Sequence, residues 1–241
     1  MRRLPIYMLI DTSESMRGKP VESVRNGLQM LASALRKDPQ TLETACLSIV
    51  TCGGYVEQLL PLTAIESVQI PDIVAQGRHC IGAGLELLCD CRIREVVSAT
   101  NERKGDWLPL VFFLTDGTSD DDVSHGLERF HALNWGSVVS CAMGPGADRS
   151  IMSRVSGEDR MVELSSVDQT TLSAFFVWRS QVPCSNEMEI GHCDENDESW
   201  SKRGWDGRYF QCGECHEVYA YTLKKCPYCG GSCSEILQTN R

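Results

Sequence analysis

Long apolar stretches and positive charge are both scarce in this sequence. No apolar run approaches the roughly 18 residues that a membrane-spanning helix requires. Asp and Glu number 33 against 23 Lys and Arg, which gives a formal net charge of −10. A surface of that sign repels phosphate backbones and anionic lipids. The composition therefore argues against nucleic acid or a membrane as the main partner.

Several motifs that mark enzymes are also missing. The sequence has no Gly-x-x-x-x-Gly-Lys-Ser/Thr loop to cradle a phosphate and no Gly-x-Ser-x-Gly elbow to carry a nucleophilic serine. Gly82-Ala83-Gly84 lacks the third glycine of a dinucleotide-binding loop. The sequence therefore predicts binding rather than catalysis.

Cysteine, by contrast, is abundant, with thirteen residues. Met1-Arg2-Arg3 precedes a short apolar stretch without a small-residue cleavage site, so no secretory signal peptide is predicted. Cysteines in a chain without an export signal indicate a reducing compartment, where they bind metal or pack in the core rather than form disulfides. A cytoplasmic location is expected.

The most informative feature is a junction between an apolar segment and a run of oxygen-bearing side chains. Residues 6–10 are apolar without alternation, which predicts a strand buried on both faces of a parallel sheet. Asp11, Ser13 and Ser15 follow directly. Their oxygens are hard donors of the kind that Mg²⁺ or Mn²⁺ accepts. Because ligands of open α/β sheets bind at the carboxyl ends of strands, a metal site is predicted here.

A second apolar segment, residues 109–114, ends in Thr115-Asp116-Gly117. A carboxylate at the end of a neighbouring strand can reach the same cation directly or through water. Asp116 is therefore included in the predicted metal site.

The two motifs together resemble the Asp-x-Ser-x-Ser and Thr-Asp-Gly loops of von Willebrand factor A domains. That resemblance implies a metal ion-dependent adhesion site, which binds a partner without catalysis. Ser13 and Ser15 would coordinate the cation directly, with Asp11 and Asp116 nearby or acting through water. A carboxylate of the partner would complete the coordination.

One position departs from the pattern of A domains. They usually carry Gly-Gly-Thr-x-Leu-Gly-x-Ala-Leu between these motifs, and the threonine is a metal ligand or contacts one. Residues 77–85 follow this sequence pattern from Ile81 to Leu85, but His79 occupies the position of the threonine. Imidazole binds transition metals readily and Mg²⁺ poorly. We expect His79 to weaken the site or to hydrogen-bond nearby, with direct ligation and a shifted metal preference as the alternative.

The rest of the first domain alternates between strand and helix patterns. Apolar residues at spacings of three and four predict a helix that begins near Pro20. Segments 45–52 and 56–62, joined by Gly53-Gly54, predict a hairpin. Further helices are predicted over 81–99, 121–133, 149–155 and 171–179, and further strands over 137–143 and 161–164. The predicted fold class of residues 1–182 is α/β: a doubly wound, mostly parallel, Rossmann-like sheet with one antiparallel edge strand.

The composition changes at Pro183, and residues 183–241 are predicted to form a separate cysteine-rich module. Seven of the thirteen cysteines fall there, and aliphatic residues are few. The two Cys-x-x-Cys pairs have the spacing of a tetrahedral zinc site: Cys212, Cys215, Cys226 and Cys229. A region this short and polar needs a bound metal ion to stabilise its folded state. We predict a zinc-ribbon-like module that binds Zn²⁺.

Two questions about these cysteines stay open. A thioredoxin-like redox pair is the alternative to zinc, although that motif occurs singly and in a βα context. A second zinc could use residues whose spacing follows no standard pattern: Cys184, His192, Cys193, His216 and Cys233.

An A domain followed by a zinc module resembles the TerY-type proteins encoded with bacterial tellurium-resistance and stress-response systems. The resemblance is carried by Leu114-Thr115-Asp116-Gly117, by Phe175-Phe176-x-Trp178 and by the paired cysteine motifs. It implies an adaptor or regulator that works beside a metal-dependent serine/threonine phosphatase and a protein kinase in phosphorylation signalling. Such a partner would present an exposed Asp or Glu to the A-domain cation.

Two other functions are the alternatives. A Mg²⁺-dependent phosphohydrolase would use Asp11 as its nucleophile, but enzymes of the haloacid-dehalogenase type place a second aspartate where this chain has Ser13. A zinc-ribbon nucleic-acid binder would need a basic module, yet residues 184–241 hold six Lys and Arg against ten Asp and Glu. The sequence favours the adaptor.

Overall fold

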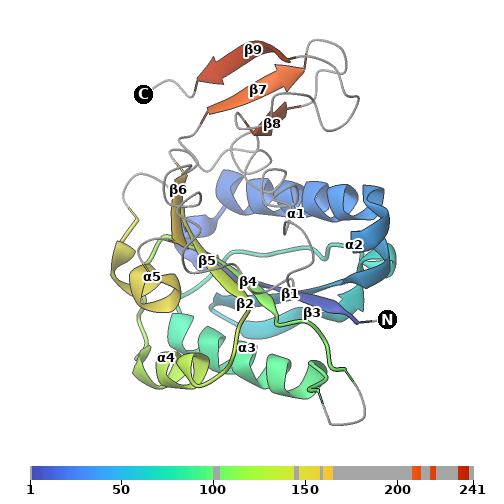
Figure 1. The fold of residues 1–241 in the computed structure, drawn as a ribbon. Helices are drawn as coiled ribbons and strands as arrows, with labels where there is room; N and C mark the ends of the chain where they lie inside the picture. Colours follow the sequence, from blue (N-terminus) through green and yellow to red (C-terminus); the bar gives the residue numbers. More distant parts are fainter. Residues whose placement is uncertain are drawn as a thin grey trace.

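A computed structural model describes residues 2–99, 104–143, 147–157, 160–164, 208–212, 218–220 and 233–238. Its main feature is a six-stranded sheet with helices on both faces (Figure 1). The strand order is β3-β2-β1-β4-β5-β6, with β1 (Leu4–Thr12), β2 (Ala45–Gly53), β3 (Val56–Ala64), β4 (Leu110–Thr115), β5 (Ser137–Met143) and β6 (Met161–Leu164). All neighbours pair in parallel except β2 and β3. The predicted doubly wound sheet with one antiparallel edge strand is confirmed.

The helices of the described residues lie in two layers. They are α1 (Lys19–Lys37), α2 (Pro39–Thr44), α3 (Ile81–Glu95), α4 (Ser124–His131) and α5 (Arg149–Ser156), with short 3-10 turns η1 (Glu14–Met16) and η2 (Ile65–Ser67). Helices α1 and α2 lie on one side of the sheet, and α3 and α4 on the other (Figure 1). Within the described residues, no helix combines the length and the apolar character needed to cross a bilayer.

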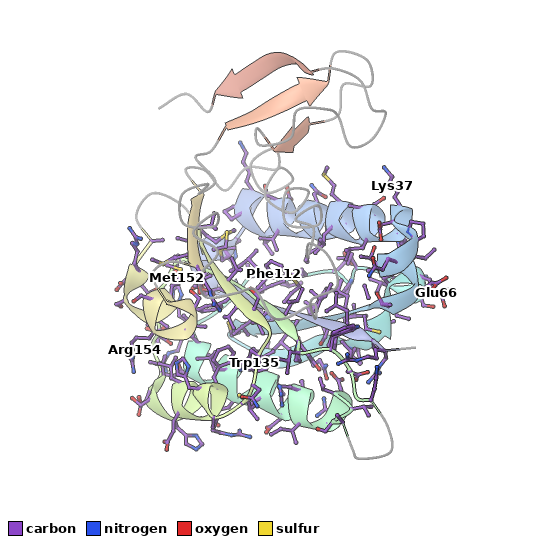
Figure 2. All side chains as sticks on the ribbon, viewed as in Figure 1. Lys37, Glu66, Phe112, Trp135, Met152 and Arg154 are labelled. Carbon is purple, nitrogen blue, oxygen red and sulfur yellow. The ribbon has the colours of Figure 1, made fainter. Side chains whose placement is uncertain are left out.

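Strand β1 lies in the middle of the sheet and separates two apolar cores. Its side chains point alternately to either side, with Ile10 in the core under α1 and Tyr7 in the core under α3, and both are fully buried. The same division continues in Figure 2, where Phe112 belongs to the first core and Trp135 and Met152 to the second. Because both faces of the sheet are covered, its central strands are apolar without alternation.

Helix α3 begins at Ile81 as predicted but ends at Glu95 rather than at residue 99. Beyond it the Val97 N–H donates to the carboxylate of Asp106 at 2.8 Å instead of to a helical carbonyl. A contact with the loop that follows the helix therefore accompanies its end at Glu95.

Helix α4 begins at Ser124 rather than at residue 121, and the two aspartates before it bind backbone N–H groups. Asp121 accepts the N–H groups of Gly82 and Ala83, the free donors at the start of α3, at 3.0 and 2.8 Å. Asp122 accepts the N–H of Ser124 at 2.9 Å. The acidic run thus belongs to the loop between β4 and α4, and not to the helix.

Three short strands near the C-terminus form a second, antiparallel sheet in the order β8-β7-β9. They are β7 (Arg208–Cys212), β8 (Val218–Ala220) and β9 (Cys233–Gln238), and Cys212 pairs in register with Cys233. The domain boundary at 182/183 and the helix over 171–179 fall outside the described residues and stay predictions. The same holds for the remaining cysteine and histidine candidates: Cys184, His192, Cys193, Cys215, His216, Cys226 and Cys229.

An ion pair fastens the segment before β1 to the loop before β4. Arg3 donates to both carboxylate oxygens of Asp106, at 3.0 and 2.6 Å, and the Asp106 side chain is only 6 % exposed. Burial raises the pKa of this carboxyl, but the hydrogen bonds from Arg3 and from the Val97 N–H outweigh burial, so the pKa lies below that of an ordinary aspartate. The ionised carboxylate therefore stabilises the fold.

Asp106→Asn is expected to lower the free energy of unfolding by about 1–3 kcal/mol at neutral pH, because a charged bidentate contact becomes a neutral one. A carboxyl with a lower pKa in the folded state stabilises above its unfolded pKa, and this contribution is lost as the pH falls through the folded pKa. The difference between wild type and variant should therefore be largest near pH 7 and shrink below about pH 4.

Urea unfolding of the wild type and Asp106→Asn at pH 3 and at pH 7 measures this difference in free energy of unfolding. Asp72→Asn is the matched control, because the Asp72 carboxylate that pairs with Arg25 is 90 % exposed and should contribute under about 0.5 kcal/mol. An Asp106→Asn effect that is the same at pH 3 and pH 7 would contradict the ionic origin of the stabilisation.

Candidate metal site

The loops that follow β1 and β4 meet at the carboxyl edge of the sheet. The two strands pair in parallel with Ile10 opposite Leu114, so the residues just beyond them are neighbours. This placement brings together all four residues that the sequence assigned to the first metal site: Asp11, Ser13, Ser15 and Asp116.

Asp11 is the buried base of the site. It is completely shielded from solvent, and each of its carboxylate oxygens accepts a hydrogen bond. Oδ1 accepts the N–H of Ser13 and Oδ2 accepts the hydroxyl of Thr115, both at 2.9 Å. The carboxylate is therefore held in one orientation by the loop that follows β1 and by the neighbouring strand β4.

The hydroxyls connect this base to Asp116. The Oγ atoms of Ser13 and Ser15 are 3.0 Å apart, and Ser15 donates to Oδ2 of Asp116 at 2.7 Å. Ser13 is buried, whereas Ser15 is exposed and the Asp116 side chain is 23 % exposed. The site thus has a closed floor and one side open to solvent.

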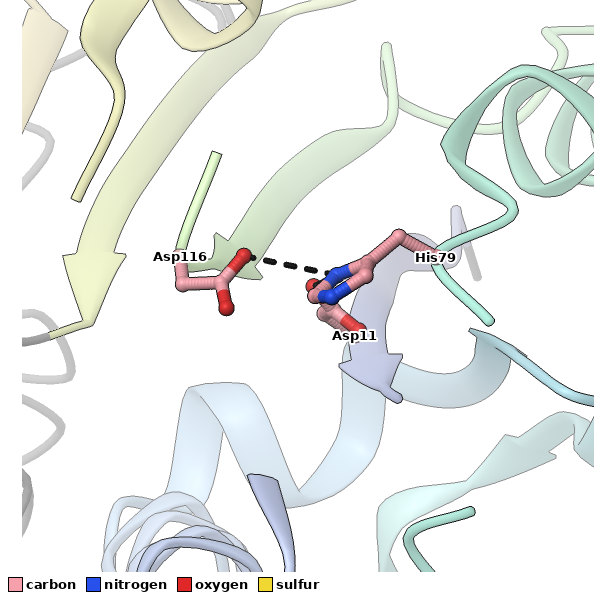
Figure 3. A group of neighbouring side chains, drawn as sticks. All are labelled: Asp11, His79 and Asp116. Carbon is pink, nitrogen blue, oxygen red and sulfur yellow. Dashed lines mark hydrogen bonds and ion pairs between the residues drawn. The ribbon is translucent and has the colours of Figure 1, made fainter. Parts of the chain in front are cut away.

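His79 lies in the same group. Its Nδ1 is 3.4 Å from Oδ2 of Asp11 and 3.5 Å from Oδ1 of Asp116 (Figure 3). The hydroxyl of Thr118 is 3.2 Å from the same nitrogen and also donates to Asp116 at 3.1 Å. Among the described residues, one group of His, Cys, Asp and Glu side chains could hold a metal ion: Asp11, His79 and Asp116, with ligand atoms within 4.8 Å of one another.

The backbone around His79 is fixed on both sides. The His79 N–H donates to the carboxylate of Asp120 at 2.9 Å, and the Asp120 N–H donates to the His79 carbonyl at 2.8 Å. Gln76 donates its N–H to the carbonyl of Thr12 at the end of β1, and Glu14 donates to the carbonyl of Gly77. The histidine loop is therefore tied directly to the loops after β1 and β4.

Two cysteines border the site. Cys52 pairs with Asp11 across the sheet, and Cys80 follows His79. Burial raises the pKa of both thiols, and the negative charges of Asp11 near Cys52 and of Asp121 near Cys80 raise it further. These shifts favour the protonated form of both thiols, and the carboxylates are the anionic groups that the site brings together.

Sequence reasoning missed three side chains that shape the site. Thr115 orients Asp11, Thr118 contacts His79 and Asp116, and Asp120 holds the histidine loop. The signal that could have found them is the dense run of hydroxyls and carboxylates from Thr115 to Asp122. Of the predicted zinc ligands, Cys212 lies at the end of β7, and the other three fall outside the described residues.

Residues 6–175 match the sequence model of the von Willebrand factor type A domain. The matched range contains the loops of Asp11 and Asp116 and the histidine between them. This chain belongs to the von Willebrand factor type A domain family. No curated protein sequence matches it.

Solved A-domain structures share this fold at low sequence identity. Mussel proximal thread matrix protein 1, with zinc in its MIDAS motif, has a TM-score of 0.52 at 17% identity over 73% of this chain and 46% of that one. Manganese-loaded TRAP from Plasmodium vivax scores 0.51 at 17% identity, over 74% and 73%. The pilus adhesin SpaC from Lactobacillus rhamnosus GG scores 0.56 at 13% identity, over 73% and 29%. This chain thus spans less than half of the byssus protein and of the adhesin.

Proposed function

We propose that this protein is a non-catalytic, metal-dependent adaptor whose A domain binds a partner protein through a divalent cation. The observation that carries the proposal is the cluster of Asp11, Ser13, Ser15, His79 and Asp116 at one edge of the sheet. Its oxygen donors suit a hard or borderline divalent ion such as Mg²⁺ or Mn²⁺. Family members described with zinc and with manganese indicate that sites of this type accept more than one ion.

The open side of the site supports a role in binding a carboxylate. Ser15 and Asp116 reach solvent, whereas Asp11 forms the buried floor. A bound divalent ion with a coordination position open to solvent can take an anionic oxygen as a further ligand. An exposed Asp or Glu of a partner is the natural group to fill the solvent-facing coordination position.

The surroundings of Asp11 argue against the phosphohydrolase alternative. A nucleophilic carboxylate needs an oxygen that can approach the substrate. Both oxygens of Asp11 accept hydrogen bonds, and the residue is fully buried. This arrangement suits a residue that positions the loop and the ion, and not one that attacks a substrate.

The C-terminal segment supports a second binding surface on the same chain. We propose that Cys212, Cys215, Cys226 and Cys229 hold a structural Zn²⁺, as their paired spacing predicts. Two modules on one chain can hold two proteins and raise their effective concentration toward each other. The resemblance to TerY-type proteins makes a cytoplasmic serine/threonine phosphatase and a kinase the proposed partners.

Capture of partners by the full chain tests this proposal. Ser15→Ala and Asp116→Ala are expected to reduce capture of the phosphatase or kinase at least about tenfold, because each removes a ligand at the open side of the site. A chelator should have the same effect on the wild type. Quantitative mass spectrometry of the captured proteins gives the measurement.

Ser98→Ala is the matched control, because Ser98 is exposed and follows the end of α3, opposite the helix end that adjoins the site. The Ser98→Ala variant should capture as much of the partner proteins as the wild type does. Capture that is insensitive to both the chelator and the site variants would refute metal-dependent binding. If the purified chain shows phosphatase turnover and Asp11→Ala loses it, the protein is an enzyme and not a non-catalytic adaptor.

A further inference from the structure

The ring nitrogen Nδ1 of His79 faces three oxygen atoms of the metal site. They are Asp11 Oδ2, Asp116 Oδ1 and Thr118 Oγ1, at 3.4, 3.5 and 3.2 Å. One ring nitrogen cannot donate a well-formed hydrogen bond to three oxygens, and N–H···O bonds are usually about 2.9–3.0 Å long. The nitrogen is thus directed at the shared space between two carboxylates rather than at one acceptor.

Two of the three ligand–ligand separations, those that involve His79, match the edges of a tetrahedral metal site. Zinc binds nitrogen and oxygen ligands at about 2.0–2.2 Å in a tetrahedron, which places neighbouring ligand atoms about 3.3–3.6 Å apart. Octahedral Mg²⁺ at about 2.0–2.1 Å places them about 2.9 Å apart. The two distances from Nδ1 to the carboxylates, 3.4 and 3.5 Å, fit the first arrangement.

We propose that His79 is a direct ligand and that it makes the site selective for zinc-like transition ions over Mg²⁺. Imidazole is a good ligand for Zn²⁺ and Co²⁺ and a poor one for Mg²⁺. The proposal rests on the metal-dependent function above and specifies its ion. It differs from the expectation that histidine at this position only weakens the site.

The groups around the three ligands support this assignment. Asp11 is oriented by Thr115 and by the Ser13 N–H, and the backbone of His79 is held on both sides by Asp120. Partners of this kind orient metal ligands and raise affinity. Three protein ligands leave a fourth tetrahedral position, which exposed Ser15, water or a partner carboxylate can fill.

The test compares metal binding by the full-length wild type and by His79→Thr, which restores the usual A-domain residue. Competition titrations with Zn²⁺ and Co²⁺ in millimolar Mg²⁺ should show a loss of about 100-fold in affinity at one site of the variant. Mg²⁺ affinity should be unchanged or higher. Zinc held by the C-terminal cysteines is common to both proteins, so elemental analysis should differ by one ion.

Two further measurements sharpen the comparison. The visible spectrum of bound Co²⁺ reports its coordination. The tetrahedral bands of the A-domain site should be lost in His79→Thr, whereas those of Co²⁺ held by the C-terminal cysteines should be the same in both proteins. His125→Ala is the matched control, because His125 lies on α4 with its side chain 64 % exposed. It should bind all three ions as the wild type does.

The outcomes separate this inference from the proposed function. Equal Zn²⁺ affinity in the wild type and His79→Thr would overturn the role of His79, while metal-dependent capture of partners could persist. Higher affinity of His79→Thr for both Zn²⁺ and Mg²⁺ would also overturn it, because His79 would then occupy the cation position. If neither protein bound a divalent ion at this site, the proposed function would fail as well.

Discussion

Asp11→Asn is expected to abolish divalent-ion binding at the A-domain site while leaving the sheet folded. The substitution keeps an oxygen that can accept the Ser13 N–H or the Thr115 hydroxyl, but it removes the buried negative charge beneath the ion. Loss of that charge should weaken binding by more than about 100-fold. The A domain of the wild type should therefore gain thermal stability as an ion is added, and the A domain of the variant should not.

A thermal-shift series over rising Zn²⁺ and Mg²⁺ concentrations measures the effect. Asp72→Asn, which changes an exposed carboxylate away from the site, should respond to ions as the wild type does. Asp11→Ala leaves two donors without an acceptor and should also lower ion-free stability by about 1–3 kcal/mol. An ion-induced shift in Asp11→Asn as large as that of the wild type would mean that Asp11 has no part in metal binding.

Gly117→Ala is expected to lower the free energy of unfolding by about 3–5 kcal/mol and to disturb the metal site. Gly117 has a φ of +88°, a left-handed conformation that other residues adopt at a cost. An added Cβ would lie 1.7 Å from the carbonyl oxygen of Asp148, which is backbone and cannot rotate away. Asp148 in turn donates its N–H to the carbonyl of Asp116, so a shift here reaches a proposed metal ligand.

Gly157→Ala separates the cost of the backbone conformation from the cost of the clash with the Asp148 carbonyl. Gly157 has a similar φ of +80°, but nothing lies within 4 Å of its added Cβ. Its ψ of 156° places it in a region that is almost exclusive to glycine, so it should lose about 1–3 kcal/mol from the backbone conformation alone. Urea unfolding compares the variants, and ion titration of Gly117→Ala should show weaker binding. Equal losses at the two positions would mean that the loop around Asp148 moves aside without cost.

Much of the fold could be predicted because its strands carry a strong local signal. Residues 6–10 and 109–114 are apolar without alternation, and the structure places them in β1 and β4 with both faces of the sheet covered. The hairpin of β2 and β3 followed from Gly53-Gly54 in the same way. Helix ends were harder to predict, since distant residues such as Asp106 and Asp121 decide where the backbone donors find their acceptors.

The sequence by itself determined which side chains follow the buried strands, and therefore which carboxylates and hydroxyls stand at the carboxyl edge of the sheet. That information is local, because a strand and the loop after it are contiguous in the chain. Only the tertiary structure decided that β1 and β4 are neighbours and that the loop of His79 folds back between their ends. Those distances depend on pairing between segments about 40 to 100 residues apart in the chain, which composition and periodicity do not encode. The histidine therefore stood in the sequence as a departure from a pattern, with ligation as one alternative, and the structure favours ligation because it places the histidine nitrogen between two aspartates.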